Sequence, residues 1–109
     1  MATVIATLKE DNGGFAGTFE TLAIRTRISI QPASKSKQSQ PDYRVYANQR
    51  YEIGGGWIRD GNRPGETYVR VSLAAPELGR TVLYANLVQL TTPYEDGTTH
   101  VLLWNAIDD

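Results

Sequence analysis

The sequence predicts an all-β chain that folds as a small antiparallel barrel or as a β-sandwich of about seven or eight strands. Three observations predict this class. Apolar residues recur at every second position, turn-forming residues separate the short runs at intervals of about 8–12 residues, and no segment has a convincing helical period. The chain has 109 residues, which is the length of one domain. We therefore treat residues 1–109 as a single β domain.

The clearest strand lies within residues 22–30. Its even positions are apolar or threonine, whereas Arg25 and Arg27 stand at odd positions. This alternation is typical of a strand with one buried and one solvated face. Phe19 is out of phase with the run. A β-bulge near residues 20–21 would restore the phase, and two separate strands joined by a bend are the alternative.

Six other segments are predicted to be strands because they are rich in β-branched and aromatic residues and end at turn signals. They are residues 3–9, 42–48, 51–59, 67–73, 81–90 and 100–105. The sequences of residues 11–14 and 96–97 favour tight turns, since Asn and Gly tolerate positive φ angles. Residues 32–41 hold Ser, Gln and two lysines between two prolines, which predicts an exposed, mobile loop within the domain. Residues 76–78 are compatible with a short helix.

The glycine triplet Gly54–Gly56 interrupts one predicted strand. Glycine inside a strand marks a bulge, a sharp bend or the close approach of another segment. In the strand before it, alternation places Tyr43 and Val45 inward and Arg44 and Tyr46 outward. The expected core consists of apolar residues on the inward faces: Leu22, Ile24, Ile28, Ile30, Val45, Val69, Val71, Leu73, Leu83, Leu87 and Leu103.

Composition restricts the possible functions. Eleven Lys and Arg against twelve Asp and Glu leave a formal charge of −1. This balance argues against a strongly basic nucleic-acid binder and leaves room for a local basic patch. The chain has no cysteine, which excludes disulfides and thiolate metal sites. No apolar run approaches about 18 residues, and the N-terminal sequence lacks the features of a signal peptide, so we expect a cytoplasmic location.

Several short pieces, which keep their order along the chain, carry a family resemblance. They are Gly17–Leu22, Pro41–Val45, Glu52–Gly54 with Trp57, Tyr68–Leu73, Tyr84–Leu87 and Leu102–Trp104. With them the chain resembles a family of small bacterial proteins of unknown function that is common on alphaproteobacterial plasmids and integrative conjugative elements. The chain departs from the family pattern at Ala74-Ala75-Pro76, where an acidic pair precedes the proline, and at Asn105, where a basic residue is frequent. The resemblance implies a mobile genetic element as the setting, but no activity.

Catalysis has little support in the sequence. His100 is the only histidine, and its place in a predicted strand favours a structural role over that of a general base. No nucleophile elbow, phosphate-binding loop or paired-histidine metal spacing occurs. We therefore expect a protein that is not an enzyme and needs no cofactor or metal. An enzyme centred on His100 is the weakest alternative.

The outward faces of the predicted strands combine aromatic rings with cations, as do single-stranded nucleic-acid binders built on small, OB-like barrels. The leading hypothesis is therefore a non-catalytic binding module for single-stranded nucleic acid. In it, aromatic rings stack on bases and arginines pair with phosphates, with two lysines in the neighbouring loop. The residues are Tyr46, Trp57 and Tyr68 for stacking, Arg44, Arg59 and Arg70 for phosphates, and Lys35 and Lys37 in the loop. In the alternative interpretation, the aromatic residues only fill the barrel and the arginines only solvate it.

A protein partner is the rival hypothesis, because exposed Tyr and Arg are also frequent in the hot spots of protein interfaces. In this case the protein would inhibit a host defence system, as anti-CRISPR or anti-restriction factors do. An exposed edge strand would also allow pairing with a partner or with a second copy of the chain. We expect no membrane partner.

Overall fold

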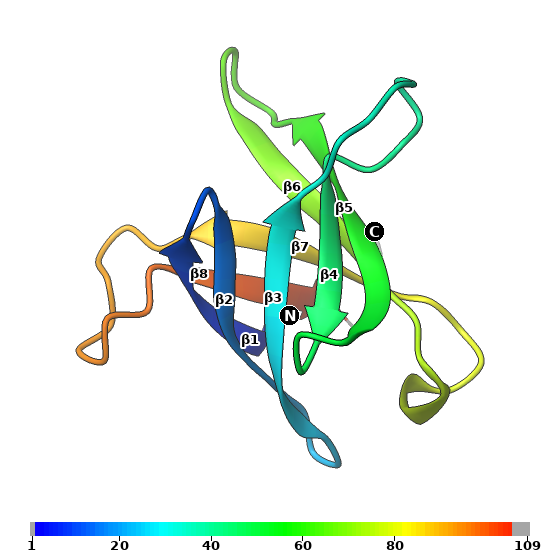
Figure 1. Ribbon diagram of the computed structural model, residues 1–109. Coiled ribbons are helices and arrows are strands. Elements are labelled where there is room, and N and C mark those ends of the chain that lie inside the picture. The colour runs from blue at the N-terminus through cyan, green and yellow to red at the C-terminus, as the bar shows by residue number, and fades with distance from the viewer. Residues whose placement is uncertain (1, 106–109) are drawn as a thin grey trace.

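The computed structural model describes residues 2–105, which form a closed barrel of eight antiparallel strands (Figure 1). Each strand pairs with the next one along the chain, and β8 pairs with β1 to close the barrel. This confirms the predicted antiparallel barrel and decides against the sandwich. The strands are β1 (Ala2–Asp11), β2 (Gly14–Glu20), β3 (Arg25–Pro32), β4 (Tyr43–Ala47), β5 (Tyr51–Asp60), β6 (Thr67–Leu73), β7 (Leu83–Gln89) and β8 (His100–Asn105).

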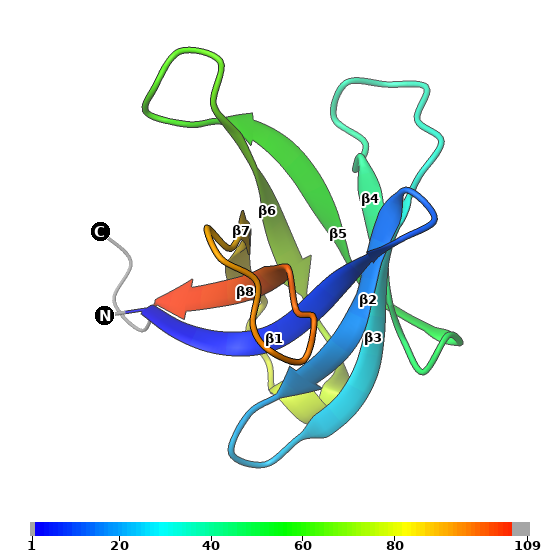
Figure 2. The same ribbon diagram turned by 90° about the vertical axis from the view of Figure 1, so that its left-hand side faces the viewer.

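The connections between strands lie alternately at the two ends of the barrel. The end that carries the β1–β2, β3–β4, β5–β6 and β7–β8 connections is called the His100 end, because β8 begins there with His100. The other end, called the Leu22 end, carries the remaining three connections and the 3₁₀ helix η1 (Pro76–Leu78). The β3–β4 and β5–β6 loops project well beyond the strands (Figures 1 and 2). Within residues 2–105, no helix is long and apolar enough to cross a membrane.

Closure of the barrel leaves no strand edge free in the part of the chain that the structure describes. Every strand from β1 to β8 has a neighbour on both sides. Barrel closure removes the unpaired backbone groups on which strand addition depends. Self-association through an exposed edge strand therefore has no free edge among residues 2–105.

The β2–β3 connection explains why Phe19 is out of phase with residues 22–30. The chain turns at residues 21–24, where the amide of Thr21 donates a hydrogen bond to the carbonyl oxygen of Ile24 at 2.8 Å. Phe19 pairs with Thr26 across the two strands and is buried. The predicted bulge near residues 20–21 was wrong, and the alternative of two separate strands is confirmed, because the turn restarts the alternation.

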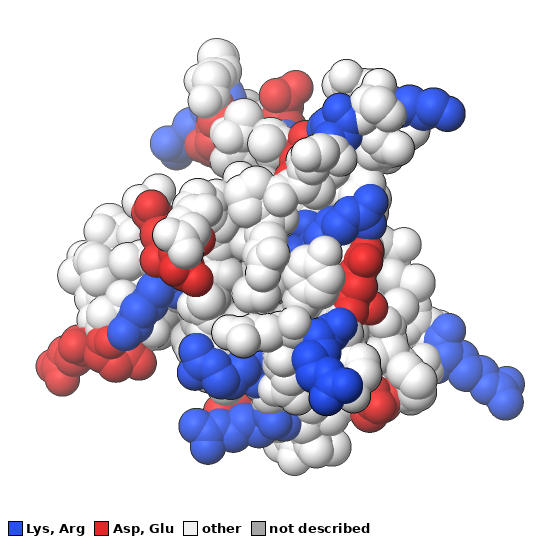
Figure 3. All heavy atoms as spheres, in the orientation of Figure 1, with Lys and Arg blue, Asp and Glu red and all other residues white. Residues whose placement is uncertain are grey.

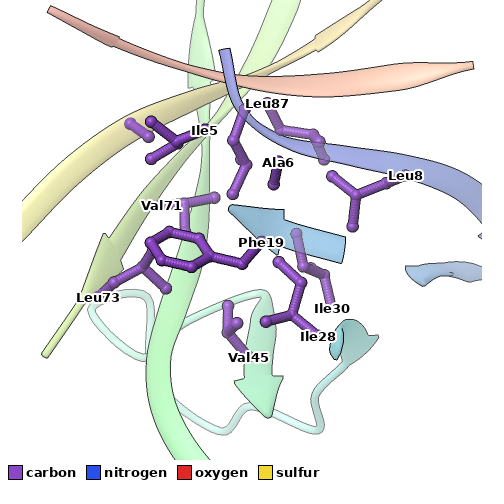
Figure 4. Close-up of a cluster of buried hydrophobic side chains, with 12 residues drawn as sticks. Ile5, Ala6, Leu8, Phe19, Ile28, Ile30, Val45, Val71, Leu73 and Leu87 are labelled. Atoms are coloured by element: carbon purple, nitrogen blue, oxygen red, sulfur yellow. The ribbon is translucent and has the colours of Figure 1, made fainter. Parts of the chain in front are cut away.

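Aliphatic side chains and the ring of Phe19 fill the interior of the barrel (Figure 4). Six expected core residues are buried, and three more pack against them while remaining partly exposed. The buried six are Ile28, Ile30, Val45, Val71, Leu73 and Leu87, and the partly buried three are Ile24, Val69 and Leu83. Val45 and Leu73 are 0% exposed, so the inward phase predicted for their strands is confirmed.

Two expected core residues lie elsewhere. Leu22 belongs to the β2–β3 turn and has a relative exposure of 110%. In β8 the inward residue is Leu102, which lies opposite Ala6 and Leu87, whereas Leu103 is half-buried. Leu102 and Leu103 are equally apolar, so the hydrophobic pattern does not indicate which of them faces inward. The pairing of β8 with β1 and β7 decides it.

The glycine triplet in β5 allows the barrel wall to bend. A Cβ atom on Gly54 would collide with the carbonyl oxygen of Ser72 on β6, so this position needs glycine for the close approach of two backbones. The β4–β5 register also shifts between Val45 and Tyr46, which leaves Ile53 as the extra residue of a β-bulge. Both features confirm the prediction of a bulge and a close approach at the triplet.

Candidate nucleic-acid interface

The six predicted binding residues on strands lie on three neighbouring strands of the wall. They are Arg44 and Tyr46 on β4, Trp57 and Arg59 on β5, and Tyr68 and Arg70 on β6. Trp57 lies opposite Arg70, and Arg59 lies opposite Tyr68. Since Val45 and Val71 point into the core, their neighbours Arg44, Tyr46 and Arg70 project outward. Trp57 shares this face as the partner of Arg70, and Arg59 and Tyr68 share it two residues farther along their strands. The structure therefore brings the six residues onto one outer surface, with the exposed Lys35 and Lys37 in the adjoining β3–β4 loop.

Trp57 connects the β3–β4 loop to the barrel wall. Its indole Nε1 donates a hydrogen bond to the carbonyl oxygen of Ser39 at 3.1 Å. A Cβ atom on Gly55 would lie only 3.1 Å from the Cη2 atom of Trp57 and 3.1 Å from the Cβ of Pro41, so the indole occupies space that glycine leaves open. The side chain is half-buried, and part of it serves packing. Only the remaining surface is free to meet a ligand.

Two of the predicted cations have carboxylate partners. Arg44 Nη1 lies 2.6 Å from Glu52 Oε2, and Lys35 Nζ lies 2.9 Å from Asp42 Oδ1. The Asp42 carboxylate also accepts a hydrogen bond from the amide of Ile58, and this bond, followed by the contact with Lys35, lowers the pKa of Asp42. The side chains of the Arg44 pair are 41% and 47% exposed. An exposed pair contributes only about 0–1 kcal/mol, so a phosphate can replace the carboxylate at little cost.

Arg70 is held by neutral groups. Its Nη1 donates to Asn86 Oδ1 at 3.3 Å, and its guanidinium lies 5.1 Å from the centre of the Tyr84 ring. Such a cation–π contact orients the guanidinium but leaves its charge uncompensated. Arg70 and the exposed Tyr84 extend the aromatic and cationic surface onto β7.

Charge is distributed very unevenly along the chain. Residues 21–59 contain seven Lys and Arg and two Asp and Glu, a formal charge of +5, whereas the rest contains four and ten, a formal charge of −6. The positive segment forms β3, β4 and β5, which are neighbours in the barrel. Lys and Arg side chains gather over the lower part of the face formed by these strands (Figure 3). A near-neutral protein thus presents one basic side, which the total charge conceals.

Three arginines on this side were missed as binding residues. Arg25 and Arg27 point outward from β3, and Arg50 stands in the β4–β5 turn, which the hydrogen bond from the Asn48 amide to the Arg27 carbonyl places next to β3. All three are exposed, and Arg50 lies 5.3 Å from the centre of the Tyr51 ring. Among residues 2–105, Arg27 and Arg50 have no carboxylate within salt-bridge distance. The signal that could have found them is the charge of each segment rather than that of the whole chain.

The family model for a protein of unknown function, DUF736, matches residues 4–106. The chain belongs to this family. The match confirms the resemblance to a family of unknown function, and the plasmid and conjugative-element setting stays a prediction. No curated protein and no solved structure matches the chain significantly. The family description assigns no activity.

A second concave feature lies at the His100 end, where a cavity of about 200 Å³ opens between the strands. Phe15, Tyr43, Gln89 and His100 contribute to its lining. His100 is 8% exposed, and burial lowers the pKa of its imidazole, which keeps the ring neutral near pH 7. Its Nδ1 lies 2.9 Å from Thr99 Oγ1. Thr99 does not line the cavity, so this bond orients the imidazole and does not present a nucleophile to a substrate.

The Leu22 end has a different character. A cavity of about 530 Å³ lies there, lined largely by apolar groups of Ile24, Ile53, Ala74 and Pro76. Tyr51, which also lines it, is 57% exposed. No three His, Cys, Asp or Glu side chains converge as metal ligands anywhere in residues 2–105.

Proposed function

We propose that the protein is a binding module that takes single-stranded nucleic acid on the outer surface of β3, β4 and β5. This surface, with the β4–β5 turn, is called the basic face, and its cations are Arg25, Arg27, Arg44, Arg50 and Arg59. The segregation of +5 formal charge into residues 21–59 is the observation that carries the proposal. A polyanion is the natural ligand of such a surface, because each contact with a phosphate releases a counterion from the strand.

The cations of the basic face differ in how readily they take a phosphate. Arg27 and Arg50 have no carboxylate to exchange and form the primary contacts. Arg44 would give up its exposed bond with Glu52 when a phosphate arrives. Lys35, with Asp42 as its partner, and Lys37 extend the same path along the β3–β4 loop. The backbone of the strand would therefore run along β3 and β4 toward the His100 end.

Aromatic side chains beside these cations favour a single strand over a duplex. Tyr46 lies half-buried on β4, opposite Ser29 on β3 and Glu52 on β5, and Tyr51 is more than half exposed beside Arg50. Aromatic rings stack on unpaired bases, whose faces a duplex hides. Trp57 and Tyr68 offer the same contact farther along the wall, Trp57 only through the part of the indole that does not pack on Gly55. The mobile-element setting that the family resemblance implies is part of this proposal.

Fluorescence anisotropy with a labelled thymidine oligonucleotide tests the proposal. Binding at about 50 mM salt that weakens steeply as salt rises is the expected result. Arg80→Gln serves as the matched control, since Arg80 is exposed in the β6–β7 connection, outside the basic face. If the wild-type protein does not bind at about 50 mM salt, the proposal is abandoned.

A protein partner is the second candidate, and one observation favours it. Leu22 is fully exposed at the tip of the β2–β3 turn, near the apolar cavity of the Leu22 end. Exposed apolar groups beside a groove are typical of protein contacts. In this case the protein would act as an inhibitor of a host defence complex. Capture of a defence-complex subunit from host lysate by the wild-type protein, with capture lost in Leu22→Ser, would support it, and recovery of no such subunit counts against it.

A further inference from the structure

Rings and hydrogen-bonding groups from several strands converge at the mouth of the barrel at the His100 end. The ring of Phe15 on β2 lies 4.6 Å from that of His100 on β8 and 6.2 Å from that of Tyr43 on β4, measured between centroids. The ring of Phe15 is tilted by 55° against that of His100 and by 52° against that of Tyr43, so the three rings surround part of the opening. Val69 and Leu87 belong to the same lining. The mouth is therefore a collar of aromatic and aliphatic groups with polar side chains, among them Gln89 and His100, in the same lining.

Two polar side chains stand together on one side of this collar. Gln89 on β7 lies directly opposite His100 on β8, and both line the cavity. The Nε2 atom of His100 has no hydrogen bond among residues 2–105, and no polar side-chain atom there is buried without a partner, so Nε2 keeps contact with solvent. A neutral imidazole has one donor and one acceptor nitrogen, and a glutamine amide has donors and an acceptor. The pair thus presents unused donors and acceptors to whatever enters.

The size and chemistry of the mouth select a class of ligand. Its volume of about 200 Å³ lies below the roughly 300–1,000 Å³ of pockets for drug-sized ligands, so the occupant is one small ring system. Aromatic walls favour a planar ring, and the pair of Gln89 and His100 favours an edge with alternating donors and acceptors. A nucleobase has both properties, and proteins that extrude a base read its edge and stack its faces in the same manner.

The charges around the mouth indicate the side from which a strand would arrive. Lys35 and Lys37 in the β3–β4 loop and Arg59 at the end of β5 lie on one side of this end, continuous with the basic face. Glu10 on β1 and the β7–β8 loop with Glu95 and Asp96 lie on the other, where Lys9 packs against the loop at Gly97 and offsets part of this negative charge. The β3–β4 and β5–β6 loops project from opposite sides of this end (Figure 2). Phosphates would be attracted to the first side and repelled by the second.

We propose that the mouth at the His100 end is a pocket for one unpaired nucleobase of a strand whose phosphates lie on the basic face. The base lies against the contacting rings of Phe15, Tyr43 and His100, on the side where the cavity opens, and its edge bonds with Gln89 and with Nε2 of His100. This inference rests on the proposed function for the strand, but the pocket itself does not need the phosphates. A nucleoside without phosphate therefore tests the pocket separately from the basic face.

NMR titration of the ¹⁵N-labelled protein with three probes distinguishes the two ideas. Adenosine or thymidine is expected to shift the amide signals of Phe15, Gln89 and His100 and to leave those of Arg27 and Arg50 unchanged. An abasic phosphodiester strand is expected to do the reverse, and an oligonucleotide that carries bases is expected to shift both sets. Nucleoside shifts without any response to the abasic strand would retain the pocket and overturn the basic face.

Gln89→Leu is the test variant, because it keeps the size of a side chain near the surface while it removes both polar groups. We expect it to weaken nucleoside binding about fivefold or more, because it removes the hydrogen bonds of Gln89 to the base. Binding of the abasic strand should stay unchanged. Gln49→Leu makes the same exchange in the β4–β5 turn at the opposite end and should not alter nucleoside binding. The proposal is overturned if nucleosides shift no signal at the mouth. It is also overturned if Gln89→Leu binds the nucleoside as tightly as the wild type and the control Gln49→Leu do.

Discussion

Replacing Arg27 and Arg50 by glutamine removes two of the three arginines of the basic face that have no carboxylate partner among residues 2–105, the third being Arg59. Residues 21–59 carry seven cations, and without the two in short pairs with Glu52 and Asp42, five remain to neutralise phosphates. For single strands the slope of log K against log[salt] is about −0.7 per phosphate contact, which gives a slope of about −3.5. Affinity should then fall about 100-fold between about 50 and 200 mM salt.

The double variant Arg27→Gln/Arg50→Gln should have a slope of about −2.1, and its affinity should fall only about 20-fold over the same range. Anisotropy titrations of the wild type, the double variant and Arg80→Gln at four or five salt concentrations measure the slopes directly. Arg80→Gln should keep the wild-type slope. An equal loss of slope in Arg80→Gln and in the double variant would refute the reasoning, because binding would then depend on charge in general and not on the basic face.

Three further predictions concern stability. Gly55→Val should displace the Trp57 indole, because the new side chain needs the space that the ring occupies, and should destabilise the fold by about 1–3 kcal/mol. A lower urea midpoint and altered tryptophan fluorescence would show this effect. An unchanged midpoint would contradict this packing. Leu102→Ala should lower the free energy of unfolding by about 2–5 kcal/mol, because Leu102 is 0% exposed. Leu22→Ala should leave the free energy of unfolding unchanged, because Leu22 is fully exposed. Equal losses in the two variants would contradict the inward position of Leu102 and the exposed position of Leu22. His100 has a pKa below its unfolded value of 6.5 because it is buried, partly offset by Glu10, so the unfolded state binds its proton first as the pH falls. The free energy of unfolding should therefore decrease as the pH is lowered through 6.5, and His100→Gln should reduce this dependence; the same pH dependence in both proteins would contradict it.

Local patterns predicted much of the wall of the barrel. Alternation assigned Val45 and Val71 to the interior and Arg44 and Arg70 to the exterior, and the structure agrees. The tight turn at residues 11–14 is confirmed by positive φ angles of 49° at Asn12 and 83° at Gly13. These predictions succeeded because a strand's side-chain period and a turn's φ preference are properties of a few consecutive residues.

The candidate interface was predicted less completely. The outward phase of Tyr46 and Tyr68 follows from alternation, but the packing of Trp57 on Gly55 and its bond to Ser39 depend on a loop that folds back over β5. Arg27 and Arg50 were missed because each looks ordinary within its own segment. The charge of their segment could have indicated them, but their grouping into one patch depends on β3 and the β4–β5 turn lying side by side, as the bond between Asn48 and Arg27 shows.

The sequence by itself determined that this chain is built from strands, which faces of most strands point inward, and that glycines would bend the wall. Tertiary structure decided what no local pattern contains. Pairing of β8 with β1 and β7 selected Leu102 over Leu103, and pairing of β4 with β3 and β5 placed the charges of residues 21–59 on one side. It also brought Phe15, Gln89 and His100 from distant segments to one mouth. The physical reason is that the alternation of side chains depends on consecutive residues of one strand. The register between strands and the closure of the barrel depend on contacts between different strands.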